Sequence, residues 1–166
     1  MIVADAAPLI HLSKIGRLDL LRQVYGNILI PRGVYDEVVV QAEGRPGASE
    51  VETGIRKKWI KTTRATVPRV LEDEGASGAD GEVIALAENK QTSLLTNDRV
   101  VATIARSHGI RVIWLTQAIV EASRKGLVTN EEAMAILREL VRAGLRVRSE
   151  VLAEIFHILK EDNRKT

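Results

Sequence analysis

The chain has 166 residues, 45% hydrophobic and 28% charged, which indicates one globular domain and excludes a disordered protein. It contains no cysteine, which excludes a thiol nucleophile, a cysteine-type zinc site and a disulfide framework. Its 24 Lys and Arg against 22 Asp and Glu leave a formal charge of +2, so a nucleic-acid surface must come from local clustering of basic residues. Aromatic residues make up 3%, too few for a base-stacking sheet such as an RRM or OB-fold surface.

The start of the chain does not have the pattern of a targeting segment. A carboxylate, Asp5, follows only four residues, which fits neither a signal-peptide core nor a transit peptide. No apolar run approaches the roughly 18 residues that span a membrane. We therefore expect a soluble, cytoplasmic protein with no membrane partner.

Short apolar runs alternate with helical patterns along the chain. The first run, 2–4, ends at Asp5 and precedes helical patterns at 8–15 and 18–25; the second, 28–30, ends at Pro31 and precedes a helix at 32–42. The later expected elements are strands at 59–63, 93–96 and 111–115 and helices at 80–90, 99–108, 117–125, 130–143 and 149–160. Strands that alternate with helices and are apolar throughout predict a parallel sheet buried on both faces. The expected fold class is therefore α/β, a three-layer α/β/α domain with a central parallel sheet of four to five strands and helices on both faces.

We expect a single domain over 1–166. The segment 41–79 is rich in Gly, Pro and charge, and we interpret it as an insertion around a weak helix. Residues 126–160 are expected to form a C-terminal helical extension, and 161–166 a frayed tail.

Carboxylates recur where a parallel sheet binds ligands, which is beyond the carboxyl ends of its strands. Asp5 and Asp98 follow two of the predicted strands, Glu37 lies on the helix after a third, and Asp80 opens the helix before the Asp98 strand. Each has a purely structural alternative. Asp5 and Asp98 could be helix N-caps, although a cap at Asp5 would put Pro8 at the N3 position, where there is no N–H to donate.

Asp80 and Glu82 are alternative candidates for the carboxylate that this helix contributes to the site. Ser77 and Asp80 match a capping box. At about 100° per residue, Asp80 shares the apolar face of its helix, whereas Glu82 is expected to point toward solvent. By the same geometry Glu37 occupies the boundary of the apolar face, where a solvated edge is the common alternative.

Four carboxylates at one edge of a sheet repel each other, which raises their pKa values unless a cation is present. All-oxygen ligands with room for water suit Mg²⁺ or Mn²⁺. Such a site supports phosphoryl-transfer chemistry. Basic residues that could contact a phosphate backbone are Arg56, Lys57 and Lys58, and Arg99 next to Asp98; solvated surface is the alternative for each. Arg146 and Arg148 alternate with apolar residues and share one side of an extended segment.

Four segments in order resemble the motifs of PIN-domain proteins, close to the archaeal and bacterial branch related to VapC-type toxin ribonucleases. They are Val3-Ala4-Asp5-Ala6-Ala7-Pro8-Leu9-Ile10, Ile30-Pro31-Arg32-Gly33-Val34-Tyr35-Asp36-Glu37-Val38, Asp80-Gly81-Glu82-Val83-Ile84-Ala85-Leu86-Ala87 and Leu94-Leu95-Thr96-Asn97-Asp98-Arg99. The resemblance covers about residues 1–125. It implies a PIN-like fold over the single domain and a nuclease active in the presence of Mg²⁺ or Mn²⁺.

The resemblance implies that Asp5, Asp80 and Asp98 hold the metal and that Glu37 completes the cluster or orients water. Glu82 is a substitute candidate for Asp80, because relatives carry a Gly-Glu-x-Glu pattern at this motif. The implied reaction is endonucleolytic cleavage of RNA to 5′-phosphate and 3′-hydroxyl ends. The implied partners are RNA, a small antitoxin protein and a second copy of the chain.

One departure from the family pattern supports a different function class. PIN domains often carry a hydroxyl residue two places after the first Asp, and this chain has Ala7 there. A catalytically silent nucleic-acid-binding or interaction module with the same fold is therefore the alternative. A phosphoacceptor or haloacid-dehalogenase-type phosphatase fits poorly, since the phosphatase requires a second Asp at the position of Ala7.

Overall fold

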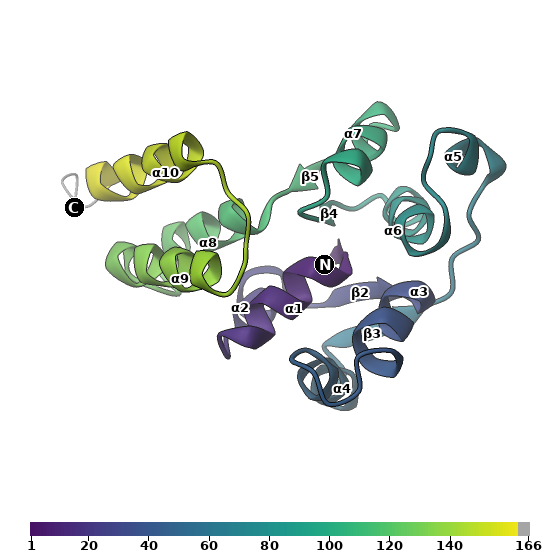
Figure 1. Cartoon of the computed structure of the whole chain (residues 1–166), viewed down its shortest axis with the longest axis horizontal. Helices are drawn as coiled ribbons and strands as arrows, with labels where there is room; N and C mark the ends of the chain where they lie inside the picture. The colour runs from purple at the N-terminus through teal and green to yellow at the C-terminus, as the bar shows by residue number, and fades with distance from the viewer. Residues whose placement is uncertain (163–166) are drawn as a thin grey trace.

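The computed structural model describes residues 1–162, which contain a five-stranded, all-parallel sheet with the strand order β3-β2-β1-β4-β5 (Figure 1). The strands are β1 (Ile2–Ala4), β2 (Ile28–Pro31), β3 (Ile60–Thr63), β4 (Leu94–Leu95) and β5 (Val112–Ile113). Every residue of β1, β2, β4 and β5 is buried, as expected for apolar strands covered on both faces. The predicted α/β fold with a parallel sheet is confirmed.

Helices connect successive strands, and further helices follow β5. They are α1 (Ala6–Lys14), α2 (Asp19–Tyr25), α3 (Arg32–Tyr35), the π-helix η1 (Asp36–Val40), α4 (Ala48–Arg56), α5 (Arg69–Asp73), α6 (Gly78–Asn89), α7 (Arg99–Ser107), α8 (Leu115–Arg124), α9 (Asn130–Arg142) and α10 (Ser149–Asp162). Crossovers between parallel strands are right-handed. The helices that connect β1 to β2 therefore lie on one face of the sheet, and those on either side of β4 in the chain lie on the other. Figure 1 shows α1, α2 and α8 on one side of the sheet and α6 and α7 on the other.

The segment 41–79, expected to be an insertion with a weak helix, is built into the sheet. It contains α4, β3 and α5, and β3 pairs with β2 through four parallel Cα partners. Only the first residue of β3, Ile60, is buried, because β3 is an edge strand. Its exposed Lys61 and Thr62 therefore lack the continuous apolar pattern of the inner strands.

The predicted helix at 32–42 differs from the structure in its second half. After α3, the chain forms a π-helical turn, and the Gln41 N–H donates to the Asp36 carbonyl at 2.8 Å. Val38 and Val39 are both buried in this wider turn. Single π-helical turns are rare and occur frequently at functional sites, and this one carries Glu37.

The C-terminal helices pack on one another, α8 against α9 and α9 against α10. The last helix, α10, extends to Asp162 and so includes the first part of the tail expected at 161–166. The remaining residues of that expected tail, 163–166, lie outside the described residues. Within residues 1–162 we find no helix that is both long and apolar enough to cross a membrane.

Candidate metal centre

The candidate site lies at the carboxyl ends of β1 and β4. These strands are neighbours, and the chain continues from them toward opposite sides of the sheet, which is the point where open α/β folds bind ligands. Asp5 directly follows β1, and Asp98 follows β4 after Thr96 and Asn97. The topology therefore brings together two of the predicted carboxylates.

Asp5 is the most buried carboxylate of the site, with 7% of its surface exposed. It is the N-cap of α1, and the Ala6 N–H donates to its Oδ1 at 2.8 Å. The Asp5 side chain therefore caps the helix through the N–H of Ala6, and the absence of an N–H on Pro8 does not prevent it. Burial raises the pKa of Asp5, hydrogen bonds from Thr96 and Ala6 lower it, and the charge of Asp98 raises it again.

The hydroxyl of Thr96, which was not among the predicted site residues, connects Asp5 to Asp98. Thr96 is fully buried; its Oγ1 donates to Asp5 Oδ2 at 2.8 Å and accepts from the Asp98 N–H at 3.1 Å. The signal in the sequence was a hydroxyl residue at the end of an apolar strand, two residues before an Asp. Although position 7 is alanine, Asp5 therefore receives a hydroxyl hydrogen bond from another strand.

Asp98 is solvent-exposed and caps α7. Its Oδ1 accepts from the Val101 N–H at 2.9 Å, the geometry of an N-cap. Its other carboxylate oxygen accepts no hydrogen bond from residues 1–162. Asp98 therefore combines the structural role we considered as its alternative with an oxygen that faces solvent.

Asp80 lies near the start of α6, which begins at Gly78 with Ser77 as N-cap. The expected capping box is wrong, because the Ser77 side chain makes no capping hydrogen bond and Asp80 makes no hydrogen bond or ion pair within residues 1–162. Local desolvation raises the pKa of this exposed carboxyl, and the charges of Asp5 and Asp98 raise it further. Asp80 therefore has no structural partner and lies within the electrostatic reach of the other two.

Glu37 projects from the π-helical turn and is also exposed. Desolvation raises its pKa first, followed by the charges of Asp5 and Asp80. The four predicted carboxylates therefore form one electrostatic group. We name Asp5, Glu37, Asp80 and Asp98 the acid cluster.

Glu82 does not point toward solvent, and that expectation is wrong. It is half-buried, and its Oε2 accepts from the Gly33 N–H of α3 at 2.8 Å. A Cβ at Gly33 would lie 3.0 Å from the Ala79 Cα, so the glycine permits α3 to approach α6 closely. Glu82 joins the helix that leads into Glu37 to the helix that carries Asp80, and its charge is not among those that raise the pKa values of the cluster.

The donor set of the acid cluster fits a hard divalent cation. All its candidate ligands are carboxylate oxygens, and no Lys or Arg within residues 1–162 forms an ion pair with them. In the same part of the chain, no group of three or more Asp, Glu or His side chains is arranged to hold a metal ion as it stands. Because Glu37 and Asp80 are exposed and make no hydrogen bond within residues 1–162, their side chains can change rotamer toward an ion held by Asp5 and Asp98.

The predicted basic residues separate into two locations. Three of them, Arg56, Lys57 and Lys58, lie between α4 and the start of β3. This is at the amino ends of the parallel strands, whereas the acid cluster lies at the carboxyl ends. Arg99 is the first residue of α7, directly after Asp98, and it lines a pocket beside the cluster. The structure therefore places only Arg99 near the site.

Comparison with known proteins agrees with the fold. The family model DUF3368, described as a PIN domain, matches residues 1–161. No curated protein matches the sequence. PIN domains are typically nucleases and typically bind Mg²⁺. Since the match covers nearly the whole chain, the protein belongs to the PIN-domain family.

Proposed function

We propose that this chain is a divalent-metal-dependent endoribonuclease that hydrolyses RNA phosphodiester bonds. The observation that carries the proposal is the acid cluster at the switch point of the sheet, where three carboxyl groups have raised pKa values and no basic side chain of residues 1–162 forms an ion pair with the cluster. A cluster of like charges at the carboxyl ends of neighbouring strands is a charge distribution that a cation would stabilise.

In this proposal Asp5, Asp80 and Asp98 hold the ion, which is Mg²⁺ or Mn²⁺. When bound, the ion supplies Lewis-acid activation of the phosphodiester and of the attacking water. Thr96 holds the Asp5 carboxylate in place, and Glu82 holds α3 against α6. Glu37, with its raised pKa and no protein partner within residues 1–162, is placed to accept a hydrogen bond from water.

The overall reaction is hydrolysis. The water oxygen forms a bond to phosphorus, the bond from phosphorus to the 3′ oxygen breaks, and the proton of the water is transferred to the leaving oxygen. The products are a 3′-hydroxyl and a 5′-phosphate, the ends implied by the family resemblance.

The test is single-turnover cleavage of an end-labelled RNA with excess protein, in EDTA and after addition of Mg²⁺ or Mn²⁺. We expect cleavage that depends on the metal, is lost in Asp80→Asn and is retained in Glu82→Gln. Cleavage in EDTA, or equal cleavage by Asp80→Asn, would point to a contaminating nuclease. Absence of cleavage by the intact protein together with retained RNA binding would support the silent binding module instead.

The partners implied by the resemblance are part of the proposal. We infer that the chain forms a homodimer and is neutralised by a small antitoxin protein encoded beside it. Light scattering of the purified chain tests the dimer. The antitoxin is tested by searching directly upstream of the gene for a short reading frame, co-expressing the two, and assaying cleavage by the purified complex.

A further inference from the structure

A pocket of about 480 Å³ opens beside the acid cluster, between α7, the start of α8 and the segment that links α9 to α10. Its polar lining is dominated by arginines, and within residues 1–162 no carboxylate lines it. We name it the arginine pocket; it is formed by Asn97, Arg99, Arg106, Trp114, Arg146 and Arg148. A pocket of this size falls in the range of small-ligand sites in proteins.

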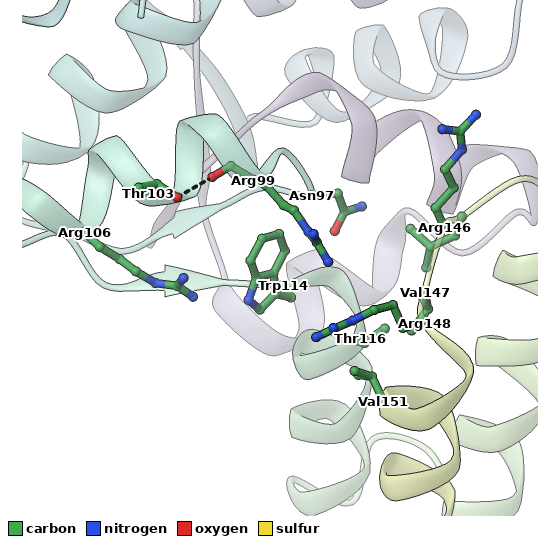
Figure 2. Close-up of a pocket in the computed structure, with 11 residues that line it drawn as sticks. Asn97, Arg99, Thr103, Arg106, Trp114, Thr116, Arg146, Val147, Arg148 and Val151 are labelled. Atoms are coloured by element: carbon green, nitrogen blue, oxygen red, sulfur yellow. Dashed lines mark hydrogen bonds between the residues drawn. The ribbon is translucent and has the colours of Figure 1, made fainter. Parts of the chain in front are cut away.

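The arginines of the pocket come from two segments, α7 and the extended segment after α9. Arg99 and Arg106 are seven residues apart on α7, which is two helical turns, so they share its exposed face. The extended segment after α9 contributes Arg146 and Arg148 to the pocket lining. Figure 2 shows Arg99, Arg106 and Arg148 pointing their guanidinium groups toward Trp114, whereas Arg146 points away from it.

These guanidinium groups have no acidic partner. None of the four arginines forms a salt bridge within residues 1–162, and the Arg106 guanidinium lies 5.5 Å from the Trp114 ring centroid. Several positive charges held together without a counter-charge form a binding surface for an anion, and guanidinium groups match phosphate oxygens in bidentate geometry. The half-buried indole adds a face on which a base can stack.

The arginine pocket and the acid cluster adjoin along the chain. Asn97, Asp98 and Arg99 are consecutive; Asn97 and Arg99 line the pocket, while Asp98 belongs to the cluster. Asn97 Oδ1 also accepts from the Leu115 N–H at 3.2 Å, which fixes the start of α8 and with it Trp114. A strand whose phosphodiester lies at the cluster therefore has its neighbouring nucleotide within reach of the arginine pocket.

We propose that the arginine pocket binds one nucleotide of single-stranded RNA next to the bond to be cut, with its phosphate on Arg99 and Arg148 and its base on Trp114. The proposal rests on the proposed ribonuclease function and specifies where its substrate is held. An acidic peptide would also pair with the arginines, but it offers no base to stack on the indole. Trp114 therefore favours RNA over a peptide partner.

The test measures binding in EDTA, where cleavage is not read, by fluorescence anisotropy of a labelled single-stranded oligouridine. We expect the double variant Arg99→Ala/Arg148→Ala to raise the Kd at least about 10-fold and to lower the magnitude of the salt slope by about 0.7 for each phosphate that no longer has an arginine partner. The matched control is Arg56→Ala/Lys57→Ala, which removes two positive charges at the opposite sheet edge. We expect this control to change the Kd less than about 3-fold and to leave the salt slope unchanged.

Stacking has its own readout. Oligouridine is expected to quench tryptophan emission of the intact chain, and Trp114→Phe is expected to lose most of this quenching while its circular dichroism and thermal unfolding stay unchanged. Equal Kd values for the two charge variants, or quenching retained in Trp114→Phe, would overturn the proposal. Tighter binding of a labelled polyglutamate peptide than of oligouridine would also overturn it. Because this experiment contains no divalent metal, RNA binding at the arginine pocket can be detected even if the chain does not cleave RNA. Likewise, cleavage can be detected even if the arginine pocket does not bind the RNA.

Discussion

The acid cluster and the arginine pocket adjoin at Asp98 and Arg99, yet they are built in different ways. Asp5 and Asp98 have short side chains fixed by N–H and hydroxyl donors at the starts of α1 and α7. The arginines reach their pocket on long side chains from two helical turns of α7 and from an extended segment. Metal ligation requires fixed geometry, while holding a polyanion requires mainly charge. We therefore expect changes in the cluster to reduce metal binding and rate, and changes in the pocket to reduce RNA affinity.

The largest expected effect separates Asp80 from Glu82. Asp80→Asn removes a proposed ligand and should lower the single-turnover rate by more than about 100-fold, beyond the loss typical of outer-shell changes. Glu82→Gln keeps the oxygen that accepts from the Gly33 N–H and should stay within about 3-fold of the unaltered rate. Both variants should unfold at similar urea concentrations. A greater loss in Glu82→Gln at equal stability would make Glu82 the ligand.

The next effect tests whether the cluster depends on fixed geometry. Thr96→Val removes the hydroxyl that donates to Asp5 and should lower the metal-dependent rate by about 10- to 100-fold. Thr96→Ser restores a hydroxyl and should recover most of that rate. Metal affinity and the pH profile should shift in Thr96→Val as well, because the hydrogen bond from Thr96 lowers the pKa of Asp5. Full activity of Thr96→Val would show that the hydroxyl is only structural.

The acid cluster should also make the free energy of unfolding depend on pH and on Mg²⁺. Asp5, Glu37 and Asp80 have raised pKa values, so the folded protein binds their protons more tightly than the unfolded chain. In EDTA the free energy of unfolding should therefore fall as the pH rises from about 4 through these raised pKa values. Saturating Mg²⁺ should oppose the loss by binding the folded state. Urea unfolding across pH, with and without Mg²⁺, measures both; a fall unaffected by Mg²⁺ would contradict a metal site here.

The smallest effect is a control outside the site. Glu74 accepts a hydrogen bond from His108 Nε2 at 2.7 Å, and this bond is the main cause of the raised pKa of His108; Glu88 contributes as well. Stability from this pairing is present at low pH and is lost as the pH rises through the raised pKa of His108. His108→Gln should remove that loss, which is within about 1 kcal/mol because Glu74 is partly exposed. Mg²⁺ should not alter this component in urea unfolding at neutral pH.

The sequence predicted the features that depend on local pattern. Residues 2–4 and 28–30 were recognisable as strands because they are apolar on both faces, and Asp5 and Asp98 stood out because each follows a strand end. Features that depend on contacts between distant segments were not predictable. The Glu82–Gly33 hydrogen bond requires α3 to pack on α6, and the π-helical turn at Glu37 has no separate signature in its residues.

The arginine pocket was predictable only in part for the same reason. The alternation at Arg146 and Arg148 predicted that they share a side, whereas Figure 2 shows Arg148 directed toward Trp114 and Arg146 directed away from it. The cluster at Arg56–Lys58 looked equally basic, yet α4 delivers it to the amino edge of the sheet. The strand expected at 59–63 is β3, but its polar residues did not show that it pairs with β2 at one side of the sheet.

The central claim is that the acid cluster binds a divalent metal through Asp5, Asp80 and Asp98. The most direct test is anomalous diffraction from crystals grown with Mn²⁺, together with crystals of Asp80→Asn grown identically. We predict an anomalous peak coordinated by carboxylate oxygens of these three residues, with Glu82 still hydrogen-bonded to Gly33, and loss of the peak in Asp80→Asn. A peak coordinated by Glu82, or no peak at the carboxyl ends of β1 and β4 at saturating Mn²⁺, would contradict this assignment.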